Sequence, residues 1–140
     1  MKFLLLCLVT VVCTSCSNYN LLINDNTLYT PDPLYLNFSV ADSQLETCLV
    51  QHIEDNRITS ARYLLSVNCS YAGIRNLEGL VQFSRIEYLS LKGNPLENFE
   101  ALFQLVNLRL LDVSETDLSC EDLQRLEDLP LDQVISAKDC

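Results

Sequence analysis

The sequence predicts an α/β fold in which short parallel strands alternate with tight helical returns and a helix closes each end. Three observations predict it. Apolar residues recur with a period of about 22 residues from residue 61 onward, their spacing within one period changes from two to three, and amphipathic segments flank the periodic region. The 140 residues are enough for one folded domain of this kind.

Residues 1–15 have the features of a secretory signal peptide. Lys2 supplies a positive start, and an apolar run of about ten residues follows it. That run is too short for a membrane-spanning helix, which needs roughly 20 residues. It fits an export signal that is removed from the mature protein.

The stretch "CTSC" at 13–16 resembles a bacterial lipobox, although Cys13 stands where that pattern usually has leucine. The resemblance implies that Cys16 is acylated, with palmitate among its chains, and anchors the protein on a membrane without spanning it. Ser17, in place of aspartate, implies transfer to the outer membrane. Ordinary signal-peptidase cleavage after Ser15 or Ser17 is the alternative, and it predicts a secreted or periplasmic protein.

Residues 16–37 are predicted to be a tether and lead-in. They show no repeat pattern and contain two prolines, Pro31 and Pro33. The apolar runs "LLI" and "LYL" indicate that part of this segment lies along the folded domain.

Residues 38–60 are predicted to form an N-terminal helical cap. Ser43 and Glu46 have the spacing of a capping box, which places a helix start here. Apolar residues then follow at helical spacing: Leu45, Cys48, Leu49 and Ile53. We expect this apolar face to cover the open end of the first repeat.

Residues 61–140 contain the repeat and the C-terminal cap. A shift of one period aligns three sets: Leu64, Val67, Cys69, Ala72 and Ile74; Ile86, Leu89, Leu91, Asn94 and Leu96; Leu108, Leu111, Val113, Thr116 and Leu118. The pattern Leu-x-x-Leu-x-Leu-x-x-Asn-x-Leu resembles a leucine-rich repeat of the short class. The resemblance implies a short solenoid with parallel strands.

The spacing within one repeat has a physical reason. Leu89 and Leu91 are two residues apart, so in a strand both point to one face. Phe99, Leu102 and Leu105 are three apart, as suits a helix with three residues per turn. The two apolar sides face each other, and stacked repeats bury them with strands roughly 4.8 Å apart.

A turn separates the strand from the helical return. Gly93 permits an unusual φ there, and the side chain of Asn94 is suited to hydrogen-bonding backbone groups inside the repeat. Thr116 occupies the same place one repeat later and is expected to do this more weakly.

The C-terminal cap is predicted to be a helix and a strand. Ser119 is a suitable N-cap for a helix that carries Leu123 and Leu126 on one face. With one residue inserted, the following stretch fits the strand template as a degenerate fourth strand: Leu131, Val134, Ser136 and Asp139.

Of the seven cysteines, those beyond the signal and Cys16 are expected to form disulfides: Cys48, Cys69, Cys120 and Cys140. Cys48 lies on the inward face of the cap and Cys69 at an inward strand position, so we expect these two to pair. Cys120 and Cys140 follow neighbouring strands and form the second expected pair. The arrangement resembles that of small leucine-rich-repeat lipoproteins of Gram-negative bacteria, and an oxidising compartment follows from it.

Composition argues against several classes of function. The formal net charge is −10 without a basic cluster, which speaks against nucleic acid as a partner. The single histidine, His52, lies on the predicted cap, and no histidine–cysteine spacing suits a metal. No phosphate-binding loop is present either. We expect no enzyme activity, no cofactor and no bound metal.

The outward strand positions form the candidate site. They are Ser66, Asn68 and Ser70; Tyr88, Ser90 and Lys92; Leu110, Asp112 and Ser114; and Gln133, Ile135 and Ala137. Within this strip the candidate protein-binding residues are Tyr88, Ser90, Lys92, Leu110 and Asp112, because an aromatic and an aliphatic residue are rimmed by charges.

The sequence therefore favours a non-enzymatic, lipid-anchored leucine-rich-repeat protein of the bacterial envelope that contacts an unidentified protein partner. A soluble secreted or periplasmic binder or inhibitor is the alternative. An envelope hydrolase is the least favoured, since it needs a catalytic constellation that the sequence does not show.

Overall fold

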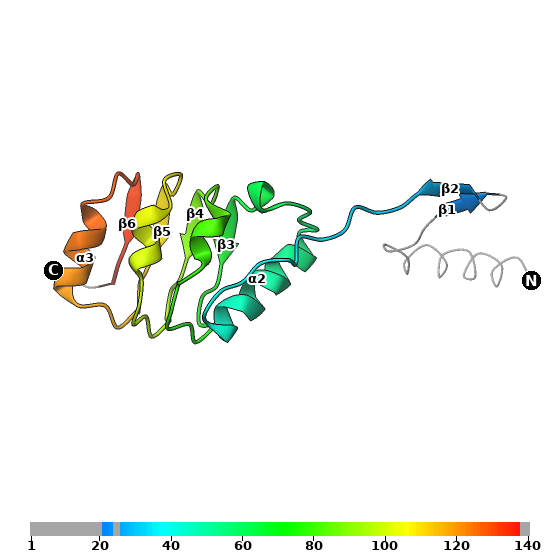
Figure 1. Ribbon diagram of the computed structural model, residues 1–140. Helices are drawn as coiled ribbons and strands as arrows, with labels where there is room; N and C mark the ends of the chain where they lie inside the picture. The colour runs from blue at the N-terminus through cyan, green and yellow to red at the C-terminus, as the bar shows by residue number, and fades with distance from the viewer. Residues whose placement is uncertain (1–20, 24–25, 138–140) are drawn as a thin grey trace, which may run out of the picture. The chain divides into compact units, whose positions relative to one another are not determined.

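The computed structural model of the chain describes residues 21–23 and 26–137 (Figure 1). They belong to two units, divided between Pro33 and Leu34. The first unit contains the strands β1 (Leu21–Ile23) and β2 (Asn26–Tyr29), which pair antiparallel. The predicted signal peptide and the predicted lipidation site, Cys16, lie outside the described residues.

The second unit contains a parallel sheet whose strands follow one another in sequence order. The strands are β3 (Ser66–Asn68), β4 (Tyr88–Ser90), β5 (Leu110–Asp112) and β6 (Gln133–Ile135). Partners across the sheet lie one period apart, as in Ser66–Tyr88 and Tyr88–Leu110, and Leu110–Gln133 is longer by a single residue. The predicted α/β fold with a parallel sheet is confirmed, as is the one-residue insertion before the last strand.

Each strand of this sheet is preceded by a helical segment. Before β3, β4 and β5 these are the 3-10 helices η1 (Ala61–Tyr63), η2 (Leu80–Phe83) and η3 (Glu100–Gln104). Side chains at three-residue spacing on the return before β4, Leu77, Leu80 and Phe83, are fully buried. They pack in one core with the inward side chains of Leu89 in β4 and of Leu91 just after it, which are also fully buried. The core is therefore a narrow layer between strands and returns.

The helix α2 (Ser43–Asp55) forms where the N-terminal cap was predicted, and it lies beside β3 (Figure 1). Its inward residues Leu45, Leu49 and Ile53 are fully buried. The predicted capping box of Ser43 and Glu46 is wrong, however. The N-cap is Asp42, one residue earlier, whose carboxylate accepts hydrogen bonds from the first backbone N–H groups of the helix.

The helix α3 (Cys120–Glu127) confirms the predicted C-terminal cap helix. Ser119 is its N-cap, and Ser119 and Asp122 form a capping box. Leu123 and Leu126 are buried. The strand β6 follows and places Val134 opposite Leu111, as the repeat template requires. The cap closes this end because helix and strand together cover the last repeat.

The lead-in to α2 packs on the core of the second unit. Partly buried residues of this segment are Leu34, Tyr35, Phe38 and Val40. Phe38 meets the buried ring of Phe83 edge-on, with 5.2 Å between centroids. Gly79 has a φ of +92°, and a Cβ there would lie only 2.6 Å from the backbone oxygen of Ser39. Glycine therefore lets the lead-in lie directly against the first return.

Candidate protein-binding face

The sheet register brings the predicted binding residues together. Tyr88 and Leu110 are direct partners across β4 and β5, and Ser90 and Asp112 are the next outward pair. The backbone of Lys92, just past β4, accepts a hydrogen bond from Tyr71 N–H at 2.7 Å. Tyr88, Ser90, Leu110 and Asp112 therefore form one continuous area on the side of the sheet opposite the core, and Lys92 continues the outward alternation past the end of β4.

Their exposure is not equal. Tyr88, Lys92, Leu110 and Asp112 are half-buried, whereas Ser90 is only 2% exposed. The alternation of the strand places Ser90 on the outward side, as predicted. Its neighbours from the adjacent repeats nevertheless cover it, so Ser90 offers little surface to a partner.

A hydrogen-bonded network explains the burial of Ser90. Its hydroxyl lies 2.9 Å from that of Ser70 and 3.4 Å from Oδ2 of Asp112, and its single proton serves one of these two contacts. Ser70 in turn donates to the side chain of Asn68 at 2.6 Å, and Ser114 donates to Asp112 at 2.7 Å. The network crosses three repeats and fixes the orientation of these side chains.

Asn94 anchors the turn behind this face, as predicted. It is 1% exposed, and its amide nitrogen donates to the carbonyl groups of Leu91 and Cys69 at 2.7 and 2.8 Å. Its amide oxygen accepts a 3.0 Å bond from Ile74 N–H. Thr116 makes the weaker version, a single 2.7 Å bond to the carbonyl of Val113. Asn94 therefore ties its own turn to the preceding repeat.

A second polar cluster was not predicted from the sequence. The hydroxyl of Tyr71 donates to Glu115 at 2.7 Å, and Lys92 forms an ion pair with the other oxygen of the same carboxylate at 3.0 Å. The ammonium of Lys92 also lies 5.8 Å from the centre of the Tyr71 ring. The hydrogen bond from Tyr71 and, next, the contact with Lys92 lower the pKa of Glu115.

This cluster depends on a repeated backbone conformation. Tyr71, Gly93 and Glu115 all have positive φ, at 56°, 67° and 58°, and they occupy the same place in successive repeats. A Cβ at Gly93 would lie 2.3 Å from two atoms of the Tyr71 ring. The glycine thus leaves the space in which the ring lies. The one-period offset between Tyr71, Gly93 and Glu115 was the available sequence signal for this alignment.

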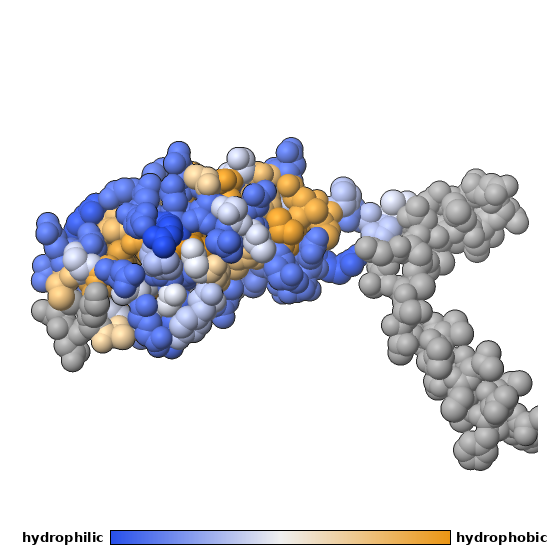
Figure 2. All heavy atoms as spheres, turned by 90° about the horizontal axis from the view of Figure 1, so that it is seen from below, coloured by the Kyte–Doolittle hydropathy of each residue, from blue (hydrophilic) through white to orange (hydrophobic). Residues whose placement is uncertain are grey.

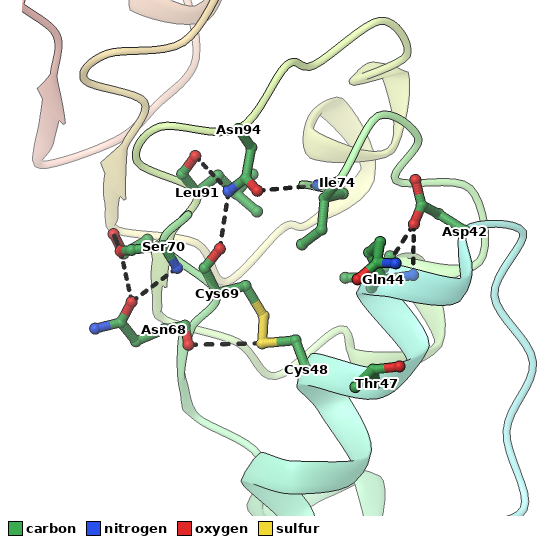
Figure 3. Close-up of a disulfide and its surroundings, with 12 residues drawn as sticks. Asp42, Gln44, Thr47, Cys48, Asn68, Cys69, Ser70, Ile74, Leu91 and Asn94 are labelled. Atoms are coloured by element: carbon green, nitrogen blue, oxygen red, sulfur yellow. Dashed lines mark hydrogen bonds between the residues drawn. A yellow bond between two sulfur atoms is a disulfide. The ribbon is translucent and has the colours of Figure 1, made fainter. Parts of the chain in front are cut away.

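The predicted pairing of Cys48 with Cys69 is confirmed (Figure 3). The two residues form a disulfide, with 5.8 Å between their Cα atoms. The bond joins α2 to the end of β3, where Cys69 is 2% exposed. Cys120 is the first residue of α3, and Cys140 lies outside the described residues. The second predicted pair therefore stays a prediction.

Asp42 forms a further connection between the cap and the repeat (Figure 3). One carboxylate oxygen accepts from Gln44 and Leu45 N–H at 2.8 and 3.2 Å. The other accepts from Arg75 and Asn76 N–H at 2.8 and 3.1 Å. Partial burial acts to raise the pKa of Asp42, but these backbone donors, Arg75 first, outweigh it and lower the pKa.

Ion pairs join neighbouring repeats in the part of the chain that the structure describes. They are Arg75–Glu97, Lys92–Glu115, Arg109–Asp132 and Arg125–Glu100. All of these side chains are substantially exposed, so each pair contributes little to stability. They also show which charged side chains on the described surface already have a partner.

Most of the described surface seen in Figure 2 is hydrophilic. In the view of Figure 2, apolar residues gather chiefly at the end of the second unit where α2 ends. Large exposed apolar side chains of the segments before and after α2 are Leu36, Tyr63 and Leu65. His52 lines an open hollow of about 300 Å³ beside Tyr63 and Leu65.

Two features are absent from residues 21–23 and 26–137. No group of three or more His, Cys, Asp or Glu side chains is arranged to hold a metal ion. No helix has both the length and the apolar character needed to cross a membrane.

No protein-family model matches the sequence, and no significant match was found among curated proteins or solved structures.

Proposed function

We propose that this chain is a leucine-rich-repeat solenoid of the bacterial envelope, lipid-anchored and non-enzymatic, that acts by binding another protein. The observation that carries the proposal is the Tyr88–Leu110 pair on the outward side of the parallel sheet. An aromatic and an aliphatic side chain lie together there, next to a hydrogen-bonded polar network that orients Asp112. Such a combination suits the centre of a protein-binding patch.

Three features support the solenoid part of the proposal. Strand partners advance by one period, with a single residue added before β6, and 3-10 helices connect the first three strands. Asn94 is buried and hydrogen-bonds the backbone of its own turn and of the preceding repeat. Repeats of this kind bury their apolar faces only against neighbours, which accounts for the helices α2 and α3 at the two ends.

The binding role is tested by replacing both Tyr88 and Leu110 with serine. Crosslinking on intact cells, followed by mass spectrometry, identifies what the wild-type protein contacts. The double variant should lose this crosslink while its unfolding midpoint changes little, because both side chains are half-exposed. A matched control is Val106→Ser, which changes an apolar side chain that is 83% exposed and outside the sheet. Retention of the crosslink in the double variant contradicts the role of this face.

The anchor is proposed from the lipobox resemblance of residues 13–16, which lie outside the described residues. Incorporation of a fatty-acid analogue should be lost in Cys16→Ser, and the protein should then be recovered without detergent. If Cys16→Ser leaves labelling and solubility unchanged, the chain is instead a soluble secreted or periplasmic binder or inhibitor.

A further inference from the structure

The two basic residues closest in sequence to the candidate face, Lys92 and Arg109, each contact a carboxylate. Lys92 pairs with Glu115 at 3.0 Å, and Tyr71 donates to the same carboxylate. Arg109 directs two nitrogens at one oxygen of Asp132, at 2.7 and 2.8 Å. Each of these cations therefore contacts a carboxylate other than those of Glu87 and Asp112.

Two acidic residues near the Tyr88–Leu110 pair have no such compensation. Glu87 immediately precedes Tyr88 at the start of β4, and Asp112 follows Leu110 by two residues on the same side of β5. Both are half-buried, and neither forms an ion pair within the described part of the chain. Along the chain, one carboxylate without an ion pair thus precedes Tyr88 and another follows Leu110.

The carboxylate of Asp112 has one oxygen that can accept a hydrogen bond from a bound partner. Its Oδ1 accepts two bonds from Ser114, at 3.0 Å from the backbone N–H and 2.7 Å from the hydroxyl. Its Oδ2 receives only the long 3.4 Å bond from Ser90. The carboxylate is therefore fixed in orientation and retains acceptor capacity at Oδ2.

We propose that this face binds a basic protein segment, in which Lys or Arg residues stand on both sides of an apolar side chain. The inference rests on the proposed binding function and specifies its partner. The apolar side chain packs on Tyr88 and Leu110, and the cations meet Glu87 and Asp112. The formal net charge of −10 adds a long-range attraction for a basic partner and a repulsion for an acidic one.

The test uses three fluorescent ten-residue peptides with the full chain, followed by fluorescence anisotropy. The first peptide is Gly-Lys-Leu-Lys-Gly written twice; the second has Glu in place of Lys, and the third has Ser in place of Leu. The first should bind most tightly and should weaken as salt rises, because exposed ion pairs are screened. Equal or tighter binding of the Glu peptide overturns the proposal.

Two charge-matched variants separate a specific site from general acidity. Glu87→Gln with Asp112→Asn should weaken binding of the first peptide about fivefold, as expected for the loss of two exposed ion pairs. Glu121→Gln with Glu127→Gln removes the same charge from exposed positions on α3 and should change the affinity less than twofold. Equal losses in the two variants overturn the proposal, since they indicate attraction to net charge alone.

The Tyr88→Ser, Leu110→Ser variant distinguishes this inference from the proposed function. Loss of peptide binding in both this variant and the Glu87/Asp112 variant supports both. If only the Tyr88/Leu110 variant loses peptide binding, the proposed binding face stands and the proposal of a basic partner is overturned. If neither variant changes the affinity of any peptide, and the crosslink on cells also persists, both proposals fail.

Discussion

Tyr71 donates a 2.7 Å hydrogen bond to Glu115, although 44 residues separate the two in sequence. The ring lies across the place where Gly93 has no side chain, so it connects the ends of the first and third strands past the second. Lys92, from the repeat between them, binds the same carboxylate. Three consecutive repeats are therefore joined by one surface cluster.

Gly93→Ala should destabilise the fold by about 2 kcal/mol, because an L side chain at a φ of +67° is strained and its Cβ would displace the Tyr71 ring. Gly73→Ala is the matched control. Gly73 has a φ of +81° but no neighbouring atom within 4 Å, so only the backbone strain of about 1 kcal/mol applies. Urea unfolding followed by circular dichroism measures both; equal losses would contradict the contact between Gly93 and Tyr71.

Tyr71→Phe should raise the pKa of Glu115, because the hydrogen bond from Tyr71 is the largest cause of its lowering. A lowered pKa in the folded state means that the cluster stabilises the fold fully above the unfolded-state pKa of Glu115. That stabilisation is lost as the pH falls through the folded-state pKa. Carbon NMR of the carboxylate measures the titration, with Tyr63→Phe as the control, since Tyr63 bonds Arg62 and no carboxylate. An unchanged Glu115 titration in Tyr71→Phe argues against this hydrogen bond.

Asp42→Ala should lower the free energy of unfolding by about 2 kcal/mol at neutral pH, since it removes a helix N-cap and the bonds to Arg75 and Asn76. Because the pKa of Asp42 is lowered in the folded state, the difference from wild type should shrink as the pH falls through that pKa. Ser43→Ala should cost much less, because Ser43 is not the cap. If Ser43→Ala lowers the free energy of unfolding more than Asp42→Ala does, Ser43 is the N-cap, as the sequence suggested.

Asn94→Ala should cost about 3 kcal/mol, because it leaves buried backbone groups of Ile74, Cys69 and Leu91 without their partner. Thr116→Ala, at the same place one repeat later, removes one bond and should cost about 1 kcal/mol. Chemical unfolding measures the pair. Equal costs would mean that Asn94 is not the inter-repeat anchor.

Replacing Cys48 and Cys69 together by alanine should destabilise the protein by about 3 kcal/mol, as expected for a bridge between residues 21 apart. Peptide mapping of the unreduced protein should show the Cys48–Cys69 link. A link between Cys48 and Cys120 in that map is the result that contradicts the pairing.

The repeat made much of the sheet predictable. The constant period gave the partners of Tyr88 and the inward place of Cys69, because both follow from alternation in a strand and a fixed offset. The buried role of Asn94 was predictable for the same reason. Local patterning was sufficient wherever the contact partner occupies the equivalent place in the next repeat.

Three features depended on contacts that no local pattern records. The Ser-x-x-Glu spacing at Ser43 suggested the wrong cap, because two of the donors to Asp42 come from a turn in the first repeat, far along the chain. Ser90 points outward as expected but is covered by Ser70 and Asp112 from its neighbours. The hydrogen bond from Tyr71 to Glu115 could not be predicted without knowing that Gly93 leaves room for the Tyr71 ring.

Because neighbouring strands are separated by a constant number of residues, this fold can be lengthened or shortened by whole repeats. Ser66–Tyr88 and Tyr88–Leu110 share the same separation. A whole extra period inserted between β4 and β5 would therefore pair with a strand of the same repeat pattern on each side. The helices at the ends would be unaffected. An insertion of another size needs a loop to absorb it, as the single added residue before β6 already requires. Related chains of different size should therefore differ by multiples of one period.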